Sequence, residues 1–318
     1  MSEVPEEIRR LAERREQARR ARDFSTADSL RDRIRDAGFD VTDTPRGPEL
    51  KSRAPPASVG AAPPTPPLVR RSDEVASLLD RPVAFDASVQ WLEEGWAPDV
   101  VRGIDSFRRH QGDRSVQHVV VDAAGMTNAT WPRDADVVHV VPEAGWATAR
   151  NAGLRRSAGA VVLVVDGSIE ATGDVLDPLV EALHDPTVGL AGPFGVVTGD
   201  LREFQDSKGP DVDAVEGYLM AFRRELLLAG RLFDEKFKFY RMADVELSFQ
   251  VKAMGLRAIV TPVPVARHEH RMWSNTPEEE RDRLSKRNFY HFLDRWRGRT
   301  DLLVRHSPGT SGAEVSSQ

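Results

Sequence analysis

Two apolar segments of the chain each end in an aspartate. VVVDAAG contains Asp122 and VVLVVDGS contains Asp166. Near-continuous Val and Leu runs are typical of parallel strands that helices cover on both faces, and ligands of such sheets bind beyond the carboxyl ends of the strands. Two acids at neighbouring strand ends can bind the ribose and base of a nucleotide and a cation on its diphosphate. The alternative for each acid is a cap of the following turn.

A third aspartate and two histidines follow later in the chain. Asp244 opens a predicted helix, where the helix dipole favours a carboxylate. His268 and His270 stand in RHEHR, with arginines on either side. A leaving diphosphate gains negative charge, so cationic groups or a metal ion are needed to stabilise it. The alternatives are a plain helix cap for Asp244 and surface positions for the histidines.

Strands and helices alternate in the region that carries these residues. This pattern predicts an α/β fold with a mostly parallel sheet flanked by helices. The predicted strands cover 82–87, 116–122, 136–141, a run that ends at Asp166, 189–197, 215–222 and 257–262. The predicted helices cover 98–110, 147–157, 224–229, 244–254 and 277–297, the last with a buried stripe of Leu284, Phe289, Phe292 and Trp296.

Five ordered motifs of this region resemble those of glycosyltransferase family 2, which has the nucleotide-sugar-binding GT-A fold. They are VVVDAAG, ARNAGLRRSAGAVVLVVDGS, VEGYLMAFRRE, GRLFDEKFKFYRMADVEL and the late RHEH. The resemblance implies an inverting, hexosyltransferase-like enzyme that moves a sugar from a nucleotide diphosphate sugar to an acceptor hydroxyl. The acceptor class stays open between a glycan, a lipid and a small molecule.

The resemblance also assigns roles to individual residues. It implies that Asp122 contacts the nucleobase, that Asp166 holds the diphosphate and a divalent metal, and that Asp244 is the catalytic base. His268 or His270 would be a further metal ligand. The remaining candidate nucleotide-sugar contacts are Arg150, Asn151, Ser168 and Glu216. For Arg150 and Asn151 the alternative is a place on the helix surface, and for Glu216 an exposed strand position.

The sequence departs from the family pattern at two positions. Ser168 stands where the metal motif has its second aspartate, and Ala243 stands where a glutamate usually precedes the base. Serine is a weaker cation ligand than a carboxylate, which argues against strict dependence on Mg²⁺ or Mn²⁺. These departures favour an alternative function as a non-catalytic, nucleotide-sugar-binding scaffold, and the N-terminal helical segment leaves a further alternative, an RNA-associated protein.

The N-terminal part has a different composition. Residues 1–47 are charge-dense with apolar residues at helical spacing, which predicts a helical hairpin. Residues 48–75 are rich in Pro and Ala and predict a linker, 76–305 the GT-A-like domain, and 306–318 a disordered tail. The segment RREQARRARDFSTADSLRDRIRDAGFDVTDTPRG is similar to the C-terminal helical extension of cysteinyl-tRNA synthetases. Positive and negative charges nearly balance there, which disfavours strong binding of RNA phosphates.

Whole-chain composition narrows the chemistry. The 318 residues contain no cysteine, which excludes disulfides, thiolate metal sites and thiol nucleophiles. A net charge of -6 argues against a generic binder of nucleic acids or anionic membranes. A signal peptide and an apolar run near 18 residues are absent from the sequence, which predicts a cytoplasmic protein and leaves peripheral membrane contact open.

Overall fold

The computed structural model describes residues 4–21, 23–37, 39–44, 47–52, 68–125 and 129–304. The chain divides into two compact units, Met1–Pro66 and Pro67–Gln318. The predicted tail, 306–318, lies outside the described residues. None of the described helices is both long enough and apolar enough to cross a membrane.

The N-terminal unit contains two helices and a β-hairpin. Helices α1 (Glu6–Arg20) and α2 (Phe24–Asp36) enclose a small core of Ile8, Leu11, Ala12, Leu30 and Ile34. Strands β1 (Phe39–Thr44) and β2 (Gly47–Ser52) pair antiparallel and pack Phe39, Val41 and Leu50 against this core. The sequence interpretation predicted only the helices and placed β2 in the linker. The alternation of apolar and polar residues in β1 and β2 is short, so it was a weaker signal than the charge-dense and Pro-rich composition of this part of the chain.

Eight strands of the C-terminal unit form one mixed sheet in the order β11-β14-β8-β13-β6-β3-β4-β5. Its parallel part joins β6, β3, β4 and β5, whereas β13 runs antiparallel between β6 and β8. These strands are β3 (Phe85–Glu93), β4 (Val116–Asp122), β5 (Asp136–His139), β6 (Gly159–Val165), β8 (Val188–Gly192), β11 (Asp211–Val212), β13 (Leu219–Arg223) and β14 (Arg257–Val260).

Two small sheets lie beside the main one. The first joins β9 (Gly195–Thr198) to β10 (Phe204–Ser207) and β12 (Ala214–Val215), and the second joins β7 (Ile169–Ala171) to β15 (Val265–Arg267). The single strands predicted for 189–197 and 215–222 are therefore each split, at Pro193–Phe194 and Glu216–Tyr218. The predicted strand 82–87 is displaced as well, since β3 begins at Phe85 and continues to Glu93.

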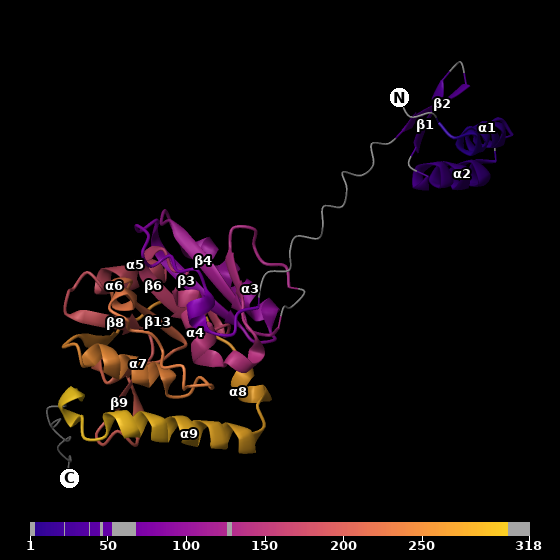
Figure 1. Cartoon of the computed structure of the whole chain (residues 1–318). Helices are drawn as coiled ribbons and strands as arrows, with labels where there is room; N and C mark the ends of the chain where they lie inside the picture. The colour runs from indigo at the N-terminus through magenta and orange to yellow at the C-terminus, as the bar shows by residue number, and fades with distance from the viewer. Residues whose placement is uncertain are drawn as a thin grey trace, which may run out of the picture. The chain divides into compact units, whose positions relative to one another are not determined.

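Helices cover both faces of the sheet (Figure 1). They are α3 (Ala97–His110), α4 (Trp146–Leu154), α5 (Leu176–Ala182), α6 (Glu225–Leu228), α7 (Ala243–Lys252), α8 (Arg271–Asn275) and α9 (Glu278–Trp296), with short 3-10 turns at Ser72–Glu74, Pro142–Ala144 and Thr300–Leu302. Alternate residues of β6 enter opposite cores: Leu163 packs with α3 and α5, and Val162 and Val164 pack with α4 and α7. This double burial explains the unbroken apolar run before Asp166.

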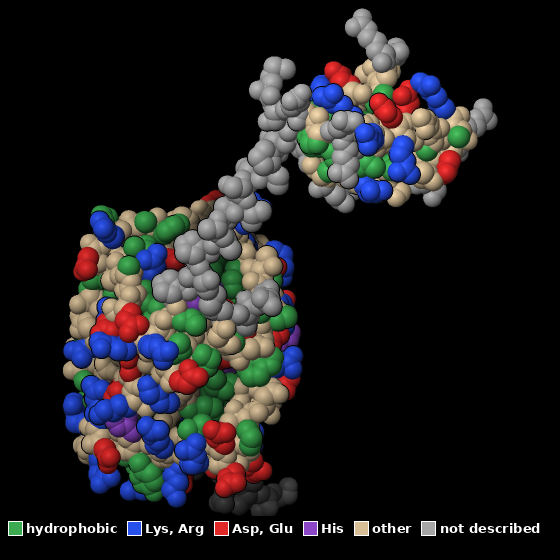
Figure 2. All heavy atoms as spheres, turned by 45° about the vertical axis from the view of Figure 1, so that its right-hand side comes forward, with side chains coloured by type: hydrophobic (Ala, Val, Ile, Leu, Met, Phe, Trp, Pro, Cys, Tyr) green, Lys and Arg blue, Asp and Glu red, His purple; other side chains and the backbone are tan. Residues whose placement is uncertain are grey.

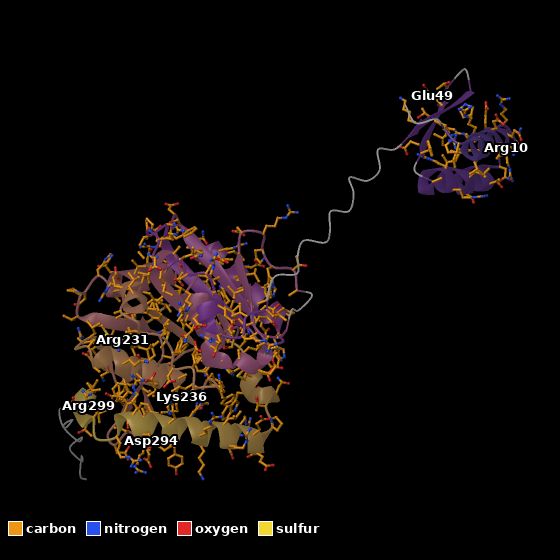
Figure 3. All side chains as sticks on the ribbon, in the orientation of Figure 1. Arg10, Glu49, Arg231, Lys236, Asp294 and Arg299 are labelled. Atoms are coloured by element: carbon orange, nitrogen blue, oxygen red, sulfur yellow. The ribbon has the colours of Figure 1, made fainter. Side chains whose placement is uncertain are left out.

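The last long helix, α9, packs against the sheet unit and contacts the loop that precedes α7. Phe292 and Trp296 of α9 are buried, Leu284 and Phe289 are only half-buried, and Asp294 points outward (Figure 3). The side-chain amide of Asn288 donates hydrogen bonds to the carbonyl oxygens of Phe239 and Arg241, at 2.8 and 2.9 Å. Helix α9 therefore fixes the loop that precedes α7.

Charged side chains of both signs intermix on the visible face of each unit (Figure 2). This distribution agrees with a moderate net charge of -6. Electrostatic steering of a charged ligand would then depend on groups inside a cavity rather than on the surface in that view.

Candidate active site

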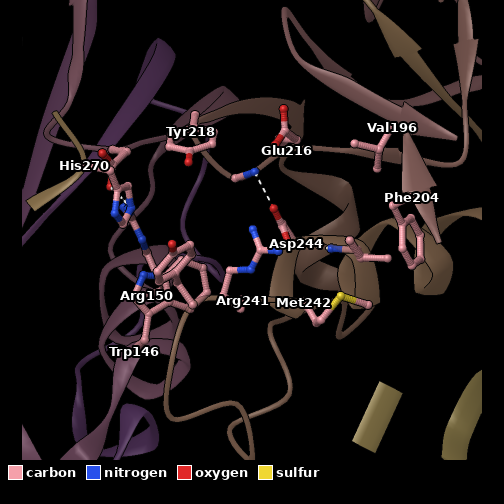
Figure 4. Close-up of a pocket in the computed structure, with 14 residues that line it drawn as sticks. Trp146, Arg150, Val196, Phe204, Glu216, Tyr218, Arg241, Met242, Asp244 and His270 are labelled. Carbon is pink, nitrogen blue, oxygen red and sulfur yellow. Dashed lines mark hydrogen bonds and ion pairs between the residues drawn. The ribbon is translucent and has the colours of Figure 1, made fainter. Parts of the chain in front are cut away.

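One cavity opens at the carboxyl edge of β6 and encloses about 720 Å³ of space, part of it open to solvent. Five residues that the sequence singled out line it: Arg150, Asp166, Glu216, Asp244 and His270. The other lining residues are Trp146, Val196, Phe204, Gly217, Tyr218, Tyr240, Arg241, Met242 and Val245 (Figure 4). These residues come from distant parts of the chain, which is the arrangement expected of a binding site.

Asp166 directly follows β6 and turns back on the next residues. Its Oδ1 atom accepts hydrogen bonds from the backbone N–H of Ser168, at 2.8 Å, and from the Ser168 hydroxyl. Its Oδ2 atom lies 3.4 Å from Nε2 of His270. Burial acts to raise the pKa of Asp166, but the hydrogen bonds and charge of His270 and the hydrogen bonds from Ser168 outweigh burial and lower this pKa to about 2. Asp166 is therefore a permanent anion at neutral pH.

His270 links Asp166 to α8. Its Nδ1 atom accepts a hydrogen bond from the backbone N–H of Trp273, at 3.1 Å, and its Nε2 atom faces Asp166. The rings of Tyr240 and Tyr218 flank it at 4.5 and 5.4 Å between centroids. The position of the imidazole is thus fixed from three sides.

Asp166 and His270 are the residues that would hold a divalent cation in this cavity. The Oδ2 atom of Asp166 and the Nε2 atom of His270 lie 3.4 Å apart. Among the described residues no group of three or more His, Asp or Glu side chains is arranged to hold a metal. At phosphate sites Mg²⁺ is usually bound by one or two carboxylates together with phosphate and water, and Asp166 would supply such a carboxylate.

Asp244 is the second residue of α7, and two backbone donors hold its carboxylate. Oδ2 accepts from the N–H of Gly217 at 2.8 Å, marked by the dashed line in Figure 4, and Oδ1 accepts from the N–H of Val245 at 2.9 Å. A Cβ atom on Gly217 would lie 3.2 Å from the Asp244 Cβ, so glycine permits this close approach. Burial raises the pKa of Asp244, and these backbone donors and Arg241 oppose the rise.

Met242, which precedes α7, has a φ of 68°. This left-handed conformation costs roughly 1–2 kcal/mol in a residue other than glycine. It turns the chain into α7 so that both Met242 and Asp244 line the cavity. The strained backbone of Met242 therefore helps to orient the carboxylate of Asp244 into the cavity.

Glu216 is a second carboxylate in the same cavity. Burial and the nearby charge of Asp244 raise its pKa from 4.5 to about 7. Its backbone N–H donates to the carbonyl oxygen of Phe194 at 2.9 Å, which fixes the loop between β12 and β13. The side chain is thus close to half ionised at neutral pH.

Arg150 and Asn151 are adjacent in the sequence, but only Arg150 lines the cavity. The buried guanidinium of Arg150 donates to the Gln90 side chain at 3.0 Å and to the carbonyl oxygen of Val165 at 3.2 Å. Burial lowers the pKa of Arg150 to about 10. Asn151 points away from the cavity, and its amide exchanges hydrogen bonds with the backbone of Phe233. This geometry corrects the expected nucleotide contact by Asn151 to a structural role, because its polar groups are already paired.

Asp122 does not line the cavity either. It is fully buried at the end of β4, opposite Glu93 of β3, with Oδ2 3.2 Å from Nδ1 of His139. Of the three candidate acids, Asp166 and Asp244 line this cavity, and Asp122 lies at another strand end. Strand order explains the difference, because β3 lies between β4 and β6 and separates Asp122 from Asp166.

Of the two histidines and Ser168, only His270 lines the main cavity. His268 is exposed and does not line the main cavity, and its Nε2 atom lies 2.7 Å from Oε2 of Glu170. This contact corrects the candidate role of His268 as a ligand beside Asp166. Ser168 lines a smaller neighbouring cavity that shares Asp166 and His270 with the main one.

Sequence reasoning missed several lining residues. Tyr218, Tyr240 and Arg241 line the main cavity, and Glu94 lines the smaller one. Burial, followed by the charges of Asp166 and Glu93, raises the pKa of Glu94 to about 8, although Arg150 opposes the rise. Glu94 follows β3, so an accurate end for that strand would have placed it at the same sheet edge as Asp166.

Two solved structures resemble the chain. A mannosyltransferase from Pyrobaculum calidifontis, in complex with GDP-Man and Mn²⁺, matches over 63% of this chain and 62% of that chain, at 24% identity and a TM-score of 0.46. GalNAc-T7, crystallised with UDP, GalNAc and Mn²⁺, matches over 68% of this chain and 49% of that chain, at 16% identity and a TM-score of 0.54. The chain has the GT-A fold. The predicted fold class is thereby confirmed, and membership of family 2 stays a prediction.

Sequence comparisons concern only a short segment outside the GT-A fold. No family model matches the chain. A stretch of 49 residues, 15% of this chain, is 47% identical to the cysteine–tRNA ligase of Methanosarcina mazei. A stretch of 48 residues is 44% identical to that of Caldicellulosiruptor saccharolyticus. The chain spans about a tenth of the length of these ligases. The N-terminal resemblance is thereby supported as a local likeness.

Proposed function

We propose that the GT-A unit transfers a sugar from a nucleotide diphosphate sugar to an acceptor hydroxyl, with inversion at the anomeric carbon. The observation that carries this proposal is one cavity with two differently tuned carboxylates, Asp166 with a lowered pKa and Asp244 with a raised pKa. Assignment to family 2 is part of the proposal, and the order of the five sequence motifs supports it.

In this proposal Asp166 and His270 lie at the diphosphate end of the donor and are the residues that would hold a divalent cation there. Such a cation, when bound, neutralises charge that develops on the leaving diphosphate. Arg241, which lines the same cavity, adds a second positive charge. Trp146 and the two tyrosines beside His270 form the wall around this half and exclude water from the donor.

Asp244 would accept the proton of the acceptor hydroxyl. As that oxygen bonds to the anomeric carbon, the bond from this carbon to the diphosphate oxygen breaks on the opposite face, and the diphosphate leaves with the bonding electrons. A raised pKa suits this task, because a stronger base takes the proton more readily. General-base assistance of this kind contributes about 10²- to 10⁴-fold.

Calorimetric titration with UDP, GDP, ADP and CDP, each with and without Mg²⁺ or Mn²⁺, tests the donor half. We expect one nucleotide to bind clearly better than the others and binding to strengthen with the metal. The matching sugar nucleotide is then incubated with acceptor alcohols, and proton NMR of the glycoside gives its anomeric configuration. A product that retains the donor configuration would contradict the inverting mechanism.

The non-catalytic alternative predicts a different outcome of the same experiment. The hydrogen bonds of Ser168 to Asp166 favour it, because they occupy a carboxylate oxygen that a metal could otherwise use. Tight nucleotide binding without consumption of any sugar nucleotide, with water or with acceptors, would support a binding protein and reject the transferase.

A further inference from the structure

The cavity has two unlike halves on either side of Asp244. One half contains Asp166 and His270 with their surrounding aromatic side chains. In the other half lie the side chains of Val196, Phe204 and Met242 (Figure 4), and Val245, the residue after Asp244, also lines the cavity. None of these four side chains has a hydrogen-bond donor or a strong acceptor. The donor half has already been assigned, and the apolar half has no role in the steps described above.

The apolar half is a built part of the fold. Val196 lies on β9, paired with Asp206 of β10 and with Ala214 of β12, and it is 8% exposed. Phe204 begins β10, and its ring packs edge-to-face on Phe292 of α9 at 6.1 Å. Because β9 is paired on both sides, the wall is fixed before any ligand binds, which lowers the entropy cost of binding.

The polar groups near this wall are few. Asp244, Glu216 and Arg241 line the cavity beside it, and the Asp244 carboxylate already accepts two backbone hydrogen bonds. A sugar ring placed against the wall would lose hydrogen bonds to water at its hydroxyl groups without replacing them. A molecule with one hydroxyl at Asp244 and an apolar group against the wall loses no hydrogen bonds to water at the wall, and burial of its apolar group favours binding.

We propose that the acceptor carries an alkyl or aryl group next to the attacking hydroxyl, and that Val196 and Phe204 select this group. This inference rests on the proposed function, because the role of Asp244 as base fixes where the hydroxyl lies. Each methylene buried against the wall improves kcat/KM about fourfold, as expected from the transfer free energy of a methylene group.

The experiment compares methyl, butyl, hexyl and phenyl glucoside with glucose as acceptors for the full chain. Hexyl glucoside has five more methylenes than methyl glucoside, so we expect kcat/KM to rise by on the order of 1,000-fold when all five are buried. The variant Val196→Thr keeps the shape of the side chain and adds a hydroxyl group, and it should lower the hexyl-to-methyl ratio at least about fivefold. The variant Phe204→Ser tests the same wall at a second position.

Val197→Thr is the matched control. Val197 is the next residue of β9 and lines a different hollow on the other face of the strand. The same chemical change there should leave the acceptor ratio within about twofold of the unaltered chain. A ratio that falls equally in both variants would indicate damage to the strand and overturn the assignment of Val196.

Binding separates this inference from the proposed function. Calorimetric titration of hexyl glucoside, with the preferred nucleoside diphosphate present, needs no turnover. Hexyl binding that weakens in Val196→Thr, together with no consumption of sugar nucleotide, would support the apolar site and reject the transferase. Transfer to glucose and methyl glucoside at rates equal to hexyl and phenyl glucoside would support the transferase and overturn the apolar acceptor.

Discussion

Asp166 and Asp244 lie in one cavity and have opposite environments. Asp166 is held by a side-chain hydroxyl, a backbone N–H and an imidazole, which lower its pKa to about 2 despite burial. Asp244 has only backbone donors and the charge of Arg241 against its burial, so its pKa is raised. The comparison teaches that the same residue type at two strand or helix ends can be a fixed anion or a proton acceptor, depending on its neighbours.

The substitution Asp244→Asn should have the largest effect on turnover. The amide cannot take a proton, so we expect the transfer rate to fall about 10²- to 10⁴-fold. Affinity for the nucleoside diphosphate should change less than about threefold, measured by calorimetry. The control Asp294→Asn, on the outward face of α9, should leave both quantities unchanged. Equal loss of affinity and turnover in Asp244→Asn would reject the assigned role.

The substitution Asp166→Asn should act on binding instead. It removes the negative charge that a cation needs, so affinity for the nucleoside diphosphate with Mn²⁺ should fall on the order of 100-fold. Without added metal, in the presence of a chelator, the variant and the unaltered chain should bind equally weakly. Unchanged affinity with Mn²⁺ would show that Asp166 holds no cation.

The two histidines allow a smaller, matched test of the same pair. His270→Gln removes the imidazole beside Asp166, and we expect nucleoside diphosphate affinity with Mn²⁺ to fall about tenfold. His268→Gln changes a residue that contacts Glu170 and does not line the cavity, so affinity should stay within about twofold. A larger effect at position 268 would place the cation elsewhere.

Glu216→Gln should give the smallest effect, on stability. Since folding raises the pKa of Glu216 from 4.5 to about 7, its ionisation destabilises the folded state as pH rises through this interval. The contribution is complete below about pH 4.5 and lost above about pH 7. Glutamine does not ionise, so the melting temperature of the variant relative to the unaltered chain should be about 5–10 °C higher at pH 8 than at pH 5. A pH-independent difference would reject the raised pKa.

Much of the sheet and part of the site followed from local sequence. Val116–Asp122 forms the strand that its apolar run predicted, and the helix predicted for 98–110 begins only one residue earlier, as α3. Asp166, Asp244 and His270 lie in one cavity because parallel strands and the helices after them deliver residues to one sheet edge. These features depend on periodicity and on residue types at element ends.

The remaining features depend on strand order and on loops. Asp122 lies at a strand end of the predicted kind, yet β3 is placed between β4 and β6, and nothing within VVVDAAG encodes this order. Asn151 belongs to the predicted ARNAG motif, but its amide meets Phe233, a contact 82 residues away in the chain. Tyr218, Arg241 and Phe204 come from loops and short strands without periodicity, so only the folded chain brings them to the cavity.

The pH dependence of the single-turnover transfer rate, with donor saturating, tests the central claim most directly. We predict an acidic limb with an apparent pKa above the usual value for aspartate, near 4, because Asp244 must be ionised to act as the base. This limb should persist in Glu216→Gln and vanish from the residual rate of Asp244→Asn. A limb that persists in Asp244→Asn and disappears in Glu216→Gln would assign the base to Glu216 and contradict the account.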